Sequence, residues 1–414
     1  MGTASSSQPA QVSVQLSVPE RSVLGLDPEL AATCVSCGLC LPHCPTFRVT
    51  GEERYSPRGR IDAMRAVDRG ELPIDDEFVD FIETCVQCRG CETACPSGVQ
   101  FGALMEQTRT SLAGDGRMTP WWQRIGFRLL PRHRLLLAGS TAIAVAQRLR
   151  LIPKRFGIPR LPLRRVRAVE TTGDDVWLFT GCVMDAWQRE THRNTAALIA
   201  LAGATHAVPD ASGGCCGALH AHAGLHDDAI SLAERVMASM PGTAPILVNS
   251  AGCGAAMKDY GHLLDTPAAR SFSARVLDIS EWLAERIDTL PDASGPRQVV
   301  IVQDPCHLRH VQRAHQPVRT LLGHVADVVE LDDDGLCCGA GGAYSALQPA
   351  LAGDVRSRKV AAVERAVERS GAVAATAAVA SANPGCSMHL GPALDLPVRH
   401  PVDIVADALG VAGR

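Results

Sequence analysis

From residue 173 onward, short apolar runs alternate with longer amphipathic segments. The apolar runs have the length of buried strands, and the segments between them have the periodicity of helices. Strands are expected at residues 176–179, 245–248, 299–302 and 373–379, and helices at 195–202, 227–240, 317–323 and 351–370. Strands that alternate with helices predict a Rossmann-like α/β fold.

The same order of elements and cysteines occurs twice in this region. In each copy a cysteine follows a strand, a Cys-Cys-Gly sequence lies in a loop, and another cysteine follows a second strand. This order indicates an internal duplication. Ligands of open α/β sheets gather at the carboxyl ends of strands, so the cysteines of each half should converge in space. They are Cys182, Cys215, Cys216 and Cys253 in the first half, and Cys306, Cys337, Cys338 and Cys386 in the second.

The region from residue 26 to 115 shows helical signals instead. A short helix is expected to begin within residues 26–30. Ser56 is a good N-cap and Pro57 a good first helical residue, so a helix should continue over residues 58–69. Its inward positions would be Ile61, Met64, Ala66 and Val67, and a further helix should cover residues 76–84. Arg58 and Arg60, at the start of the longer helix, would either offset a nearby negative charge or be solvated.

A basic connector joins the two regions. Residues 117–167 contain thirteen Lys or Arg and no Asp or Glu, and the formal net charge of the whole chain is −4, so the rest carries −17. Such segregation predicts an anionic partner, either a lipid surface or an acidic protein face. Within the connector, Trp121 and Trp122 precede an uncharged stretch at residues 135–147. This stretch is shorter than the roughly 20 residues that span a bilayer, so it is either a buried linker helix or an interfacial helix.

Composition narrows the class of protein. The 414 residues are 46% hydrophobic but only 4% aromatic, which predicts a sizeable core of Ala, Leu and Val. Residues 1–25 read as a disordered polar tail with no secretory signal. Sixteen cysteines in a chain without such a signal favour a reducing, cytoplasmic compartment and thiolates committed to metal, not disulfides.

Two identical cysteine spacings carry the clearest chemistry. Cys34, Cys37, Cys40 and Cys44 follow the pattern Cys-x2-Cys-x2-Cys-x3-Cys-Pro, and Cys85, Cys88, Cys91 and Cys95 repeat it. This is the ligand pattern of a ferredoxin with two [4Fe–4S] clusters, in which the fourth cysteine of each run serves the other cluster. We therefore assign Cys34, Cys37, Cys40 and Cys95 to one cluster, and Cys85, Cys88, Cys91 and Cys44 to the other. Zinc is the alternative ligand, but two runs that both end in Cys-Pro argue against it.

The eight C-terminal cysteines leave more alternatives open. Four thiolates in each half could hold a further iron–sulfur cluster or a zinc ion, or they could be buried inert thiols. The histidines nearby are also ambiguous. His220, His222 and His226 would form a zinc site or a quinone contact, or would be exposed, and His307 would donate a hydrogen bond to a thiolate or cap a loop.

The chain resembles the iron–sulfur subunit of bacterial glycolate oxidase (glycolate dehydrogenase). The resemblance extends over about residues 25–410. It rests on the two ferredoxin-type runs, on Tyr-Ser-Pro-Arg-Gly-Arg at 55–60, on Cys-Cys-Gly-Ala-Leu-His at 215–220, and on Cys-Cys-Gly-Ala-Gly-Gly at 337–342 followed by Gln348 and Pro349. It implies an N-terminal α-helical two-[4Fe–4S] domain followed by a duplicated α/β cysteine-rich (CCG) domain. The expected units are a tail at 1–25, a ferredoxin-type domain at 26–115, the connector at 116–170, and CCG domains at 171–295 and 296–414.

What the resemblance implies is an electron-transfer subunit with no catalytic residue of its own. A partner subunit with a flavin would oxidise glycolate to glyoxylate, and this chain would pass the electrons to a quinone or similar acceptor. No dinucleotide-binding or Walker pattern is present, and no nucleic-acid partner is expected. Localisation would be cytoplasmic, with a peripheral position on the inner face of the cell membrane as the alternative.

Three rival functions differ in what they require. The chain could serve a D-lactate or glycerol-3-phosphate dehydrogenase, because specificity would lie in the flavin subunit. It could be an autonomous enzyme like heterodisulfide reductase, whose cysteine-rich units end in Cys-x-x-Cys. Here Ala256 and His389 stand where that last cysteine would be, which counts against this reading. A regulator or scaffold with structural metal is the third, and the two-cluster module counts against it.

Overall fold

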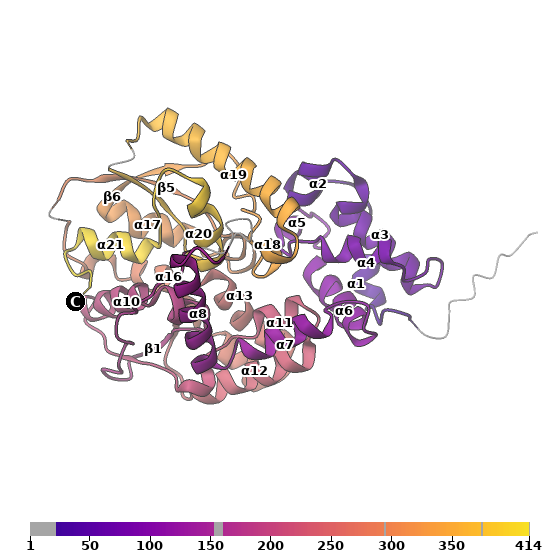
Figure 1. Ribbon diagram of the computed structural model, residues 1–414, viewed down its shortest axis with the longest axis horizontal. Coiled ribbons are helices and arrows are strands. Elements are labelled where there is room, and N and C mark those ends of the chain that lie inside the picture. The colour runs from indigo at the N-terminus through magenta and orange to yellow at the C-terminus, as the bar shows by residue number, and fades with distance from the viewer. Residues whose placement is uncertain (1–21, 153–159, 294, 374–375, 414) are drawn as a thin grey trace, which may run out of the picture.

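The computed structural model describes residues 22–152, 160–293, 295–373 and 376–413 (Figure 1). A helical lobe formed by the N-terminal region lies against one side of a larger α/β body. The expected disordered tail falls almost entirely outside the described residues. Within the described ranges, no helix is long and apolar enough to cross a membrane.

The helical lobe contains the two ferredoxin-type loops. Its helices are α1 (Pro28–Ala32), α2 (Pro45–Thr50), α3 (Pro57–Asp68), α4 (Asp76–Glu83), α5 (Gly90–Thr93) and α6 (Phe101–Gly114). Side chains cap three of them: Asp27 accepts from the amides of α1, Ser56 from that of Gly59 in α3, and Asp75 from that of Phe78 in α4. The lobe has its own core, which includes Ile61, Met64, Ile82, Leu104 and Leu112. The expected helices at 26–30, 58–69 and 76–84 are therefore confirmed to within two residues.

The connector forms two surface helices, α7 (Trp121–Leu129) and α8 (His133–Arg148). Helix α8 packs on α9 (Val183–Trp187), where the Trp187 indole donates to Ser140 over 2.8 Å. Only Ser140 and Ala144 of α8 are buried, because the helix lies on the outside of the α/β body. The reading of residues 135–147 as a buried linker helix is therefore wrong.

The first sheet is parallel with strand order β2-β1-β3-β4. Its strands are β1 (Val176–Phe179), β2 (His206–Ala207), β3 (Ile246–Val248) and β4 (Val276–Asp278). The associated helices are α9, α10 (Arg189–Leu201), α11 (Ala218–His222), α12 (His226–Ser239), α13 (Ala251–Lys258), α14 (Tyr260–Leu263), α15 (Pro267–Ser273) and α16 (Ile279–Ala284).

The second sheet repeats this topology with the order β6-β5-β7-β8, again all parallel. Its strands are β5 (Gln298–Val302), β6 (Ala326–Glu330), β7 (Ala377–Ala380) and β8 (Val398–Arg399). Its helices are α17 (His315–Val325), α18 (Tyr344–Leu347), α19 (Pro349–Ser370), α20 (Pro384–Leu390) and α21 (Pro401–Ala408). The matching orders confirm the duplicated α/β fold. Strand β7 overlaps the strand expected at 373–379, of which residues 374–375 lie outside the described residues.

One apolar core joins the two halves of the α/β body. Helices α10 and α21 pack together, as do α16 and α17, so that Leu247 and Ile279 share a cluster with Val300, Leu321 and Val405. The N-terminal part of α19 reaches over to α2 of the helical lobe (Figure 1). Helix α6 of the lobe also contacts α11 of the first half, so the helical lobe is held against both halves.

Candidate metal centres

Three of the first-run cysteines, Cys34, Cys37 and Cys40, lie in a loop after α1. Together with Cys95, from the end of the second run, they line one cavity with an empty volume of about 420 Å³. Ser36 and Gly38 have φ of 54° and 84°, and these left-handed residues turn the loop around the cavity. Cys37 is exposed, so this site reaches the molecular surface.

The fourth cysteine of the first run, Cys44, lies with the second loop instead. It is buried beside Cys88, and the Cys91 thiol is surrounded by Cys88, Cys44 and Cys85. Burial raises the pKa of Cys44 and of Cys91, which, as free thiols, would then stay protonated. Gln87 and Arg89 are left-handed at the loop positions that match Ser36 and Gly38.

This arrangement fits clusters better than single ions. The thiols form two groups, each drawn from both runs, and the Gln87 amide donates to the Cys85 sulfur over 3.4 Å, as amides do around cluster thiolates. Among the described residues, no three His, Cys, Asp or Glu side chains gather closely enough to hold one metal ion. The crossed ligand assignment made from the sequence stays a proposal that agrees with these positions.

Two buried arginines hold the loops in place. Arg60 is 1% exposed and donates to the backbone oxygens of Phe81 and Tyr55 over 2.6 and 2.5 Å. Arg109 of α6 donates to the backbone oxygens of Ile82, Cys85 and His222 over 2.7, 2.9 and 2.6 Å. Sequence reasoning considered Arg60 only as a charge-offset or solvated residue and missed Arg109, because their partners are backbone atoms distant in sequence.

In the first CCG half, four cysteines converge at the carboxyl ends of the strands. Cys182 follows β1 and its thiol pairs with that of Cys215, while Cys216 pairs with Cys253 of α13. Gly217 follows with φ of 80°, and a Cβ there would lie 3.2 Å from the backbone oxygen of Ala229. The expected convergence is therefore present.

The second half shows the same arrangement of paired thiols. Cys306 pairs with Cys337, and Cys338 with Cys386. The Gly339 amide donates to Cys337 over 3.4 Å, and Asn383 to Cys386 over 3.5 Å. The Cys337 thiol is also within hydrogen-bonding reach of Cys88 in the helical lobe. The second CCG half thus touches the second ferredoxin-type loop directly.

The histidines near the first Cys-Cys-Gly do not form a common site. His220 is buried with Nε2 3.1 Å from the Phe127 oxygen, and His226 is exposed at the start of α12. The ring of His222 lies 5.6 Å from that of His307 between centroids, tilted by 33°, and Nδ1 of His307 lies 3.5 Å from the Cys306 sulfur. The zinc-site reading of this group is therefore wrong, and the contact expected between His307 and a cysteine is present.

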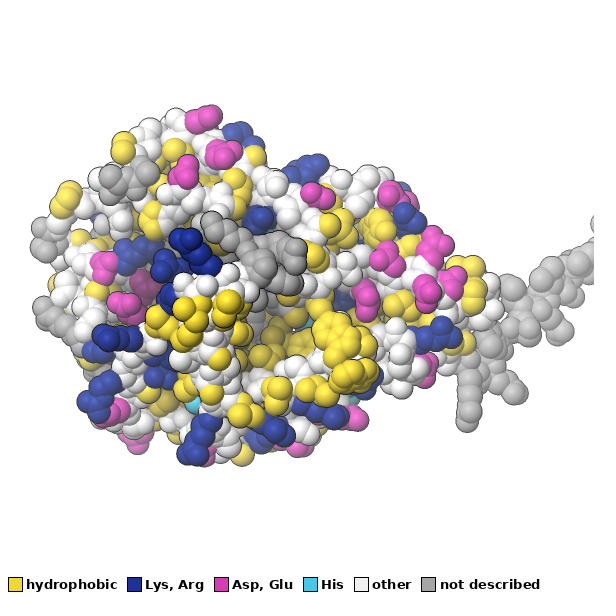
Figure 2. Space-filling view, viewed as in Figure 1, with side chains coloured by type: hydrophobic (Ala, Val, Ile, Leu, Met, Phe, Trp, Pro, Cys, Tyr) yellow, Lys and Arg dark blue, Asp and Glu magenta, His cyan; other side chains and the backbone are white. Residues whose placement is uncertain are grey.

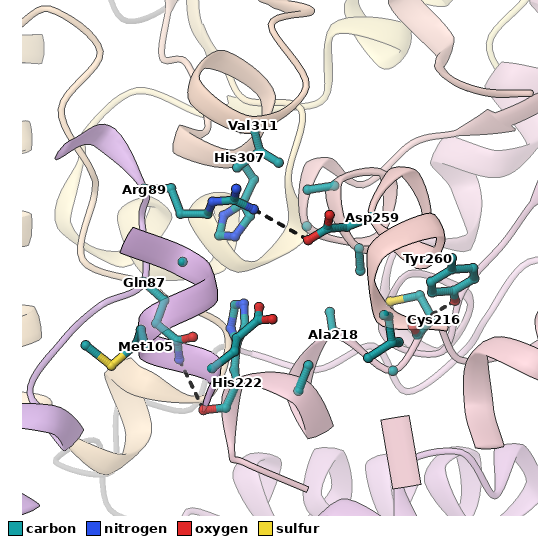
Figure 3. A pocket seen from close by; sticks show the side chains of 18 of the residues that line it. Gln87, Arg89, Met105, Cys216, Ala218, His222, Asp259, Tyr260, His307 and Val311 are labelled. Atoms are coloured by element: carbon teal, nitrogen blue, oxygen red, sulfur yellow. Dashed lines mark hydrogen bonds and ion pairs between the residues drawn. The ribbon is translucent and has the colours of Figure 1, made fainter. Parts of the chain in front are cut away.

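A cavity lies where the helical lobe and both CCG halves meet (Figure 3). Gln87 donates to the His222 backbone oxygen over 3.1 Å, and Arg89 lies 3.6 Å from Asp259. Cys216 lines its far side. Burial and then the charge of Asp259 raise the pKa of Glu106, another lining residue, to about 7.

Fold and site together define an iron–sulfur electron-transfer protein with a two-cluster module and a duplicated cysteine-rich domain. A family model described as 4Fe-4S dicluster domain matches residues 30–99, and one described as Cysteine-rich domain matches 176–258 and 300–391. The probable glycolate oxidase iron–sulfur subunit of Bacillus subtilis is 32% identical, with 86% of this chain and 87% of that protein covered.

Two further relatives extend the comparison. The glycolate oxidase iron–sulfur subunit of Escherichia coli is 29% identical over 91% of this chain and 93% of its own. A subunit of the dihydromethanophenazine:CoB–CoM heterodisulfide reductase of Methanosarcina barkeri is 27% identical over 92% of this chain and 94% of its own. This chain belongs to the family of glycolate oxidase iron–sulfur subunits, and iron–sulfur clusters are its cofactors.

Proposed function

We propose that this chain is the electron-transfer subunit of a glycolate dehydrogenase complex. Oxidation of glycolate to glyoxylate releases two electrons and two protons, and a flavin on a partner subunit would take them up. The bound clusters supply one-electron redox chemistry between that flavin and a quinone-type acceptor. The Escherichia coli and Bacillus subtilis relatives are named as subunits of such an oxidase, which supports this choice of substrate.

The observation that carries the proposal is that the cysteine sites follow one another from the surface to the second CCG half. Electrons would arrive at the exposed Cys37 loop and pass to the buried loop of Cys85, Cys88 and Cys91. That loop touches Cys337 of the second CCG half. The proposed ligands are Cys34, Cys37, Cys40 and Cys95 for one cluster, and Cys44, Cys85, Cys88 and Cys91 for the other.

A second part of the proposal concerns where the complex works. Helix α7 presents Trp121 and Trp122, which are 73% and 55% exposed, together with Ile125 and Leu129. Figure 2 shows apolar side chains gathered over α7 and along α8, with basic side chains around them. Apolar residues beside exposed arginines fit an anionic lipid surface, so we infer a peripheral position at the membrane.

Co-purification tests the main proposal. The tagged chain, co-expressed with candidate flavoprotein subunits and isolated anaerobically, should co-purify with a flavin-containing partner. The complex should reduce a dye with glycolate, whereas the chain alone should not. Glycolate, D-lactate and glycerol 3-phosphate would be compared, because preference for either of the last two would reassign the complex. Glycolate oxidation by the flavin-free chain would overturn the subunit reading.

A further inference from the structure

A second cavity lies beneath α7, next to the buried ferredoxin-type loop. Its empty volume is about 620 Å³. Cys85 and Gln87 form one wall, Gln123 and Phe127 of α7 form another, and Ala343 and Tyr344 close it from the second CCG half. It shares Gln87 and His222 with the cavity of Figure 3, which has no lining residue from α7.

Two nitrogen atoms of lining residues are buried and lack a hydrogen-bond partner within the part of the chain that the structure describes. They are Nε of Arg109 and Nδ1 of His222. The other Arg109 nitrogens are fixed on the backbone oxygens of Ile82, Cys85 and His222, so the guanidinium cannot turn to satisfy Nε elsewhere. A buried donor without a partner costs free energy, which a ligand with a carbonyl oxygen would recover.

The walls of the cavity also indicate how such a ligand would arrive. Gln123 and Phe127 lie on the helix whose outer face exposes Trp121, Trp122 and Ile125. If that face rests on a bilayer, a molecule dissolved in lipid can enter alongside α7 without crossing bulk water. The ligand would then lie against Cys85, a proposed cluster ligand.

We propose that this cavity binds the headgroup of a lipid-soluble quinone. The inference rests on the proposed function, which requires an electron acceptor, and it names the place where that acceptor binds. Reduction of the quinone to the quinol takes up two electrons and two protons. The electrons come from the Cys85 loop and the protons from water at the open side of the cavity. Arg109 and His222 position the two carbonyl oxygens.

Two variants, at alanines three positions apart in the sequence, test this assignment. Ala343 lines the cavity, and Ala346 on α18 is exposed and does not. The iron-loaded chain alone would be photoreduced with a deazaflavin and mixed anaerobically with ubiquinone-1 or with ferricyanide, a hydrophilic acceptor. In Ala343→Trp the indole would occupy space that the quinone needs, and forcing both into the cavity is costly. Ubiquinone-1 reduction should therefore slow about tenfold or more, while ferricyanide reduction stays unchanged. Ala346→Trp should change neither rate.

A conservative second variant keeps the test decisive if Ala343→Trp loses iron. His222→Phe keeps a ring of similar size and removes the unpartnered nitrogen. Loss of one hydrogen bond should weaken ubiquinone-1 binding to the oxidised chain about fivefold by calorimetry. Equal ubiquinone-1 reduction by the two tryptophan variants, or unchanged binding in His222→Phe, would overturn the assignment. Neither glycolate nor the flavin subunit is used, so failure of the complex to oxidise glycolate would leave these results unaffected.

Discussion

The thiols of Cys88 and Cys337 lie within hydrogen-bonding reach of each other, although one belongs to a ferredoxin-type loop and the other to the second CCG half. They share a small buried cluster with Val86, Cys306 and Tyr344. Cys215 holds the position of Cys337 in the first half and pairs with Cys182 as Cys337 pairs with Cys306, but no cysteine of a ferredoxin-type loop is among the contacts described for it. The duplicated halves therefore differ in how they contact the helical lobe. Among the contacts described, only the second half places a thiol against the second ferredoxin-type loop.

That inequality predicts a selective effect of replacing Cys337. Cys337→Ala removes a hydrogen-bond partner of the Cys88 sulfur, and such bonds stabilise the reduced form of a cluster. The reduction potential of the cluster bound by the second loop should fall, as measured by EPR-monitored redox titration. Cys215→Ala is the matched control and should leave that potential unchanged. Equal shifts in both variants would mean that the contact has no electronic role.

Crossed ligation predicts which cluster suffers when Cys95 is replaced. Cys95 lines the cavity of Cys34, Cys37 and Cys40, and of its own run only Cys91 lines that cavity with it. Cys95→Ala should therefore abolish or alter the EPR signal of the first-loop cluster, and Cys44→Ala that of the second. The assignment is wrong if Cys95→Ala instead removes the signal that Cys88→Ala removes.

Arg60 should matter for stability far more than its neighbour Arg58. Arg60→Leu removes two hydrogen bonds from a buried charged donor, so that the backbone oxygens of Tyr55 and Phe81 keep only the hydroxyls of Thr46 and Thr84. We expect a loss of about 3 kcal/mol in the free energy of unfolding. Arg58 is partly exposed and pairs with Glu53, so Arg58→Leu should cost much less stability. Denaturant unfolding, with iron counted per chain, measures both. Equal losses of stability in the two variants would show that the buried hydrogen bonds of Arg60 add no stability beyond that of an exposed ion pair.

Charge reversal on the connector should weaken binding to anionic vesicles. Arg128, Arg132 and Arg134 are exposed, whereas Arg124 donates to the backbone oxygens of Thr119 and Ala113 and is better left intact. Each basic residue near an anionic leaflet contributes about 1 kcal/mol, an attraction that fades over about 8 Å at physiological salt. The triple Arg→Glu variant should therefore float poorly with anionic liposomes, and wild-type flotation should decline as salt rises.

The control for that experiment has the same change in net charge elsewhere. Arg235, Arg313 and Arg358 are exposed on other parts of the α/β body. Their triple reversal to Glu should leave flotation unchanged. If both triple variants bind alike, or if neither loses binding or association with the flavin subunit, the connector is only a solvated linker.

The central strands were predictable from sequence because they are continuous apolar runs buried on both faces. The outer strands were not. Strands β2 and β8 have two residues each, and Ala326–Glu330 of β6 mixes acidic with apolar residues because it lies at a sheet edge. Their pairing depends on the neighbouring strand and not on their own pattern.

The candidate sites divide in the same way. Spacing alone predicted that each cysteine run would form a loop and that the C-terminal cysteines would converge. The contacts of Arg109 with His222, and of Cys88 with Cys337, join segments far apart in the chain. No local pattern encodes them, so they became visible only with the packed structure.

Contact of the second loop with the C-terminal half also has a consequence for biogenesis. Ribosomes deliver the chain from its N-terminus, and N-terminal units fold first. The loop of Cys85, Cys88 and Cys91 is therefore synthesised well before Tyr344, whose hydroxyl donates to the Thr84 oxygen and helps to cover that loop. A cluster carrier has free access to the loop only during this interval, so cofactor delivery would precede the docking of the second CCG half.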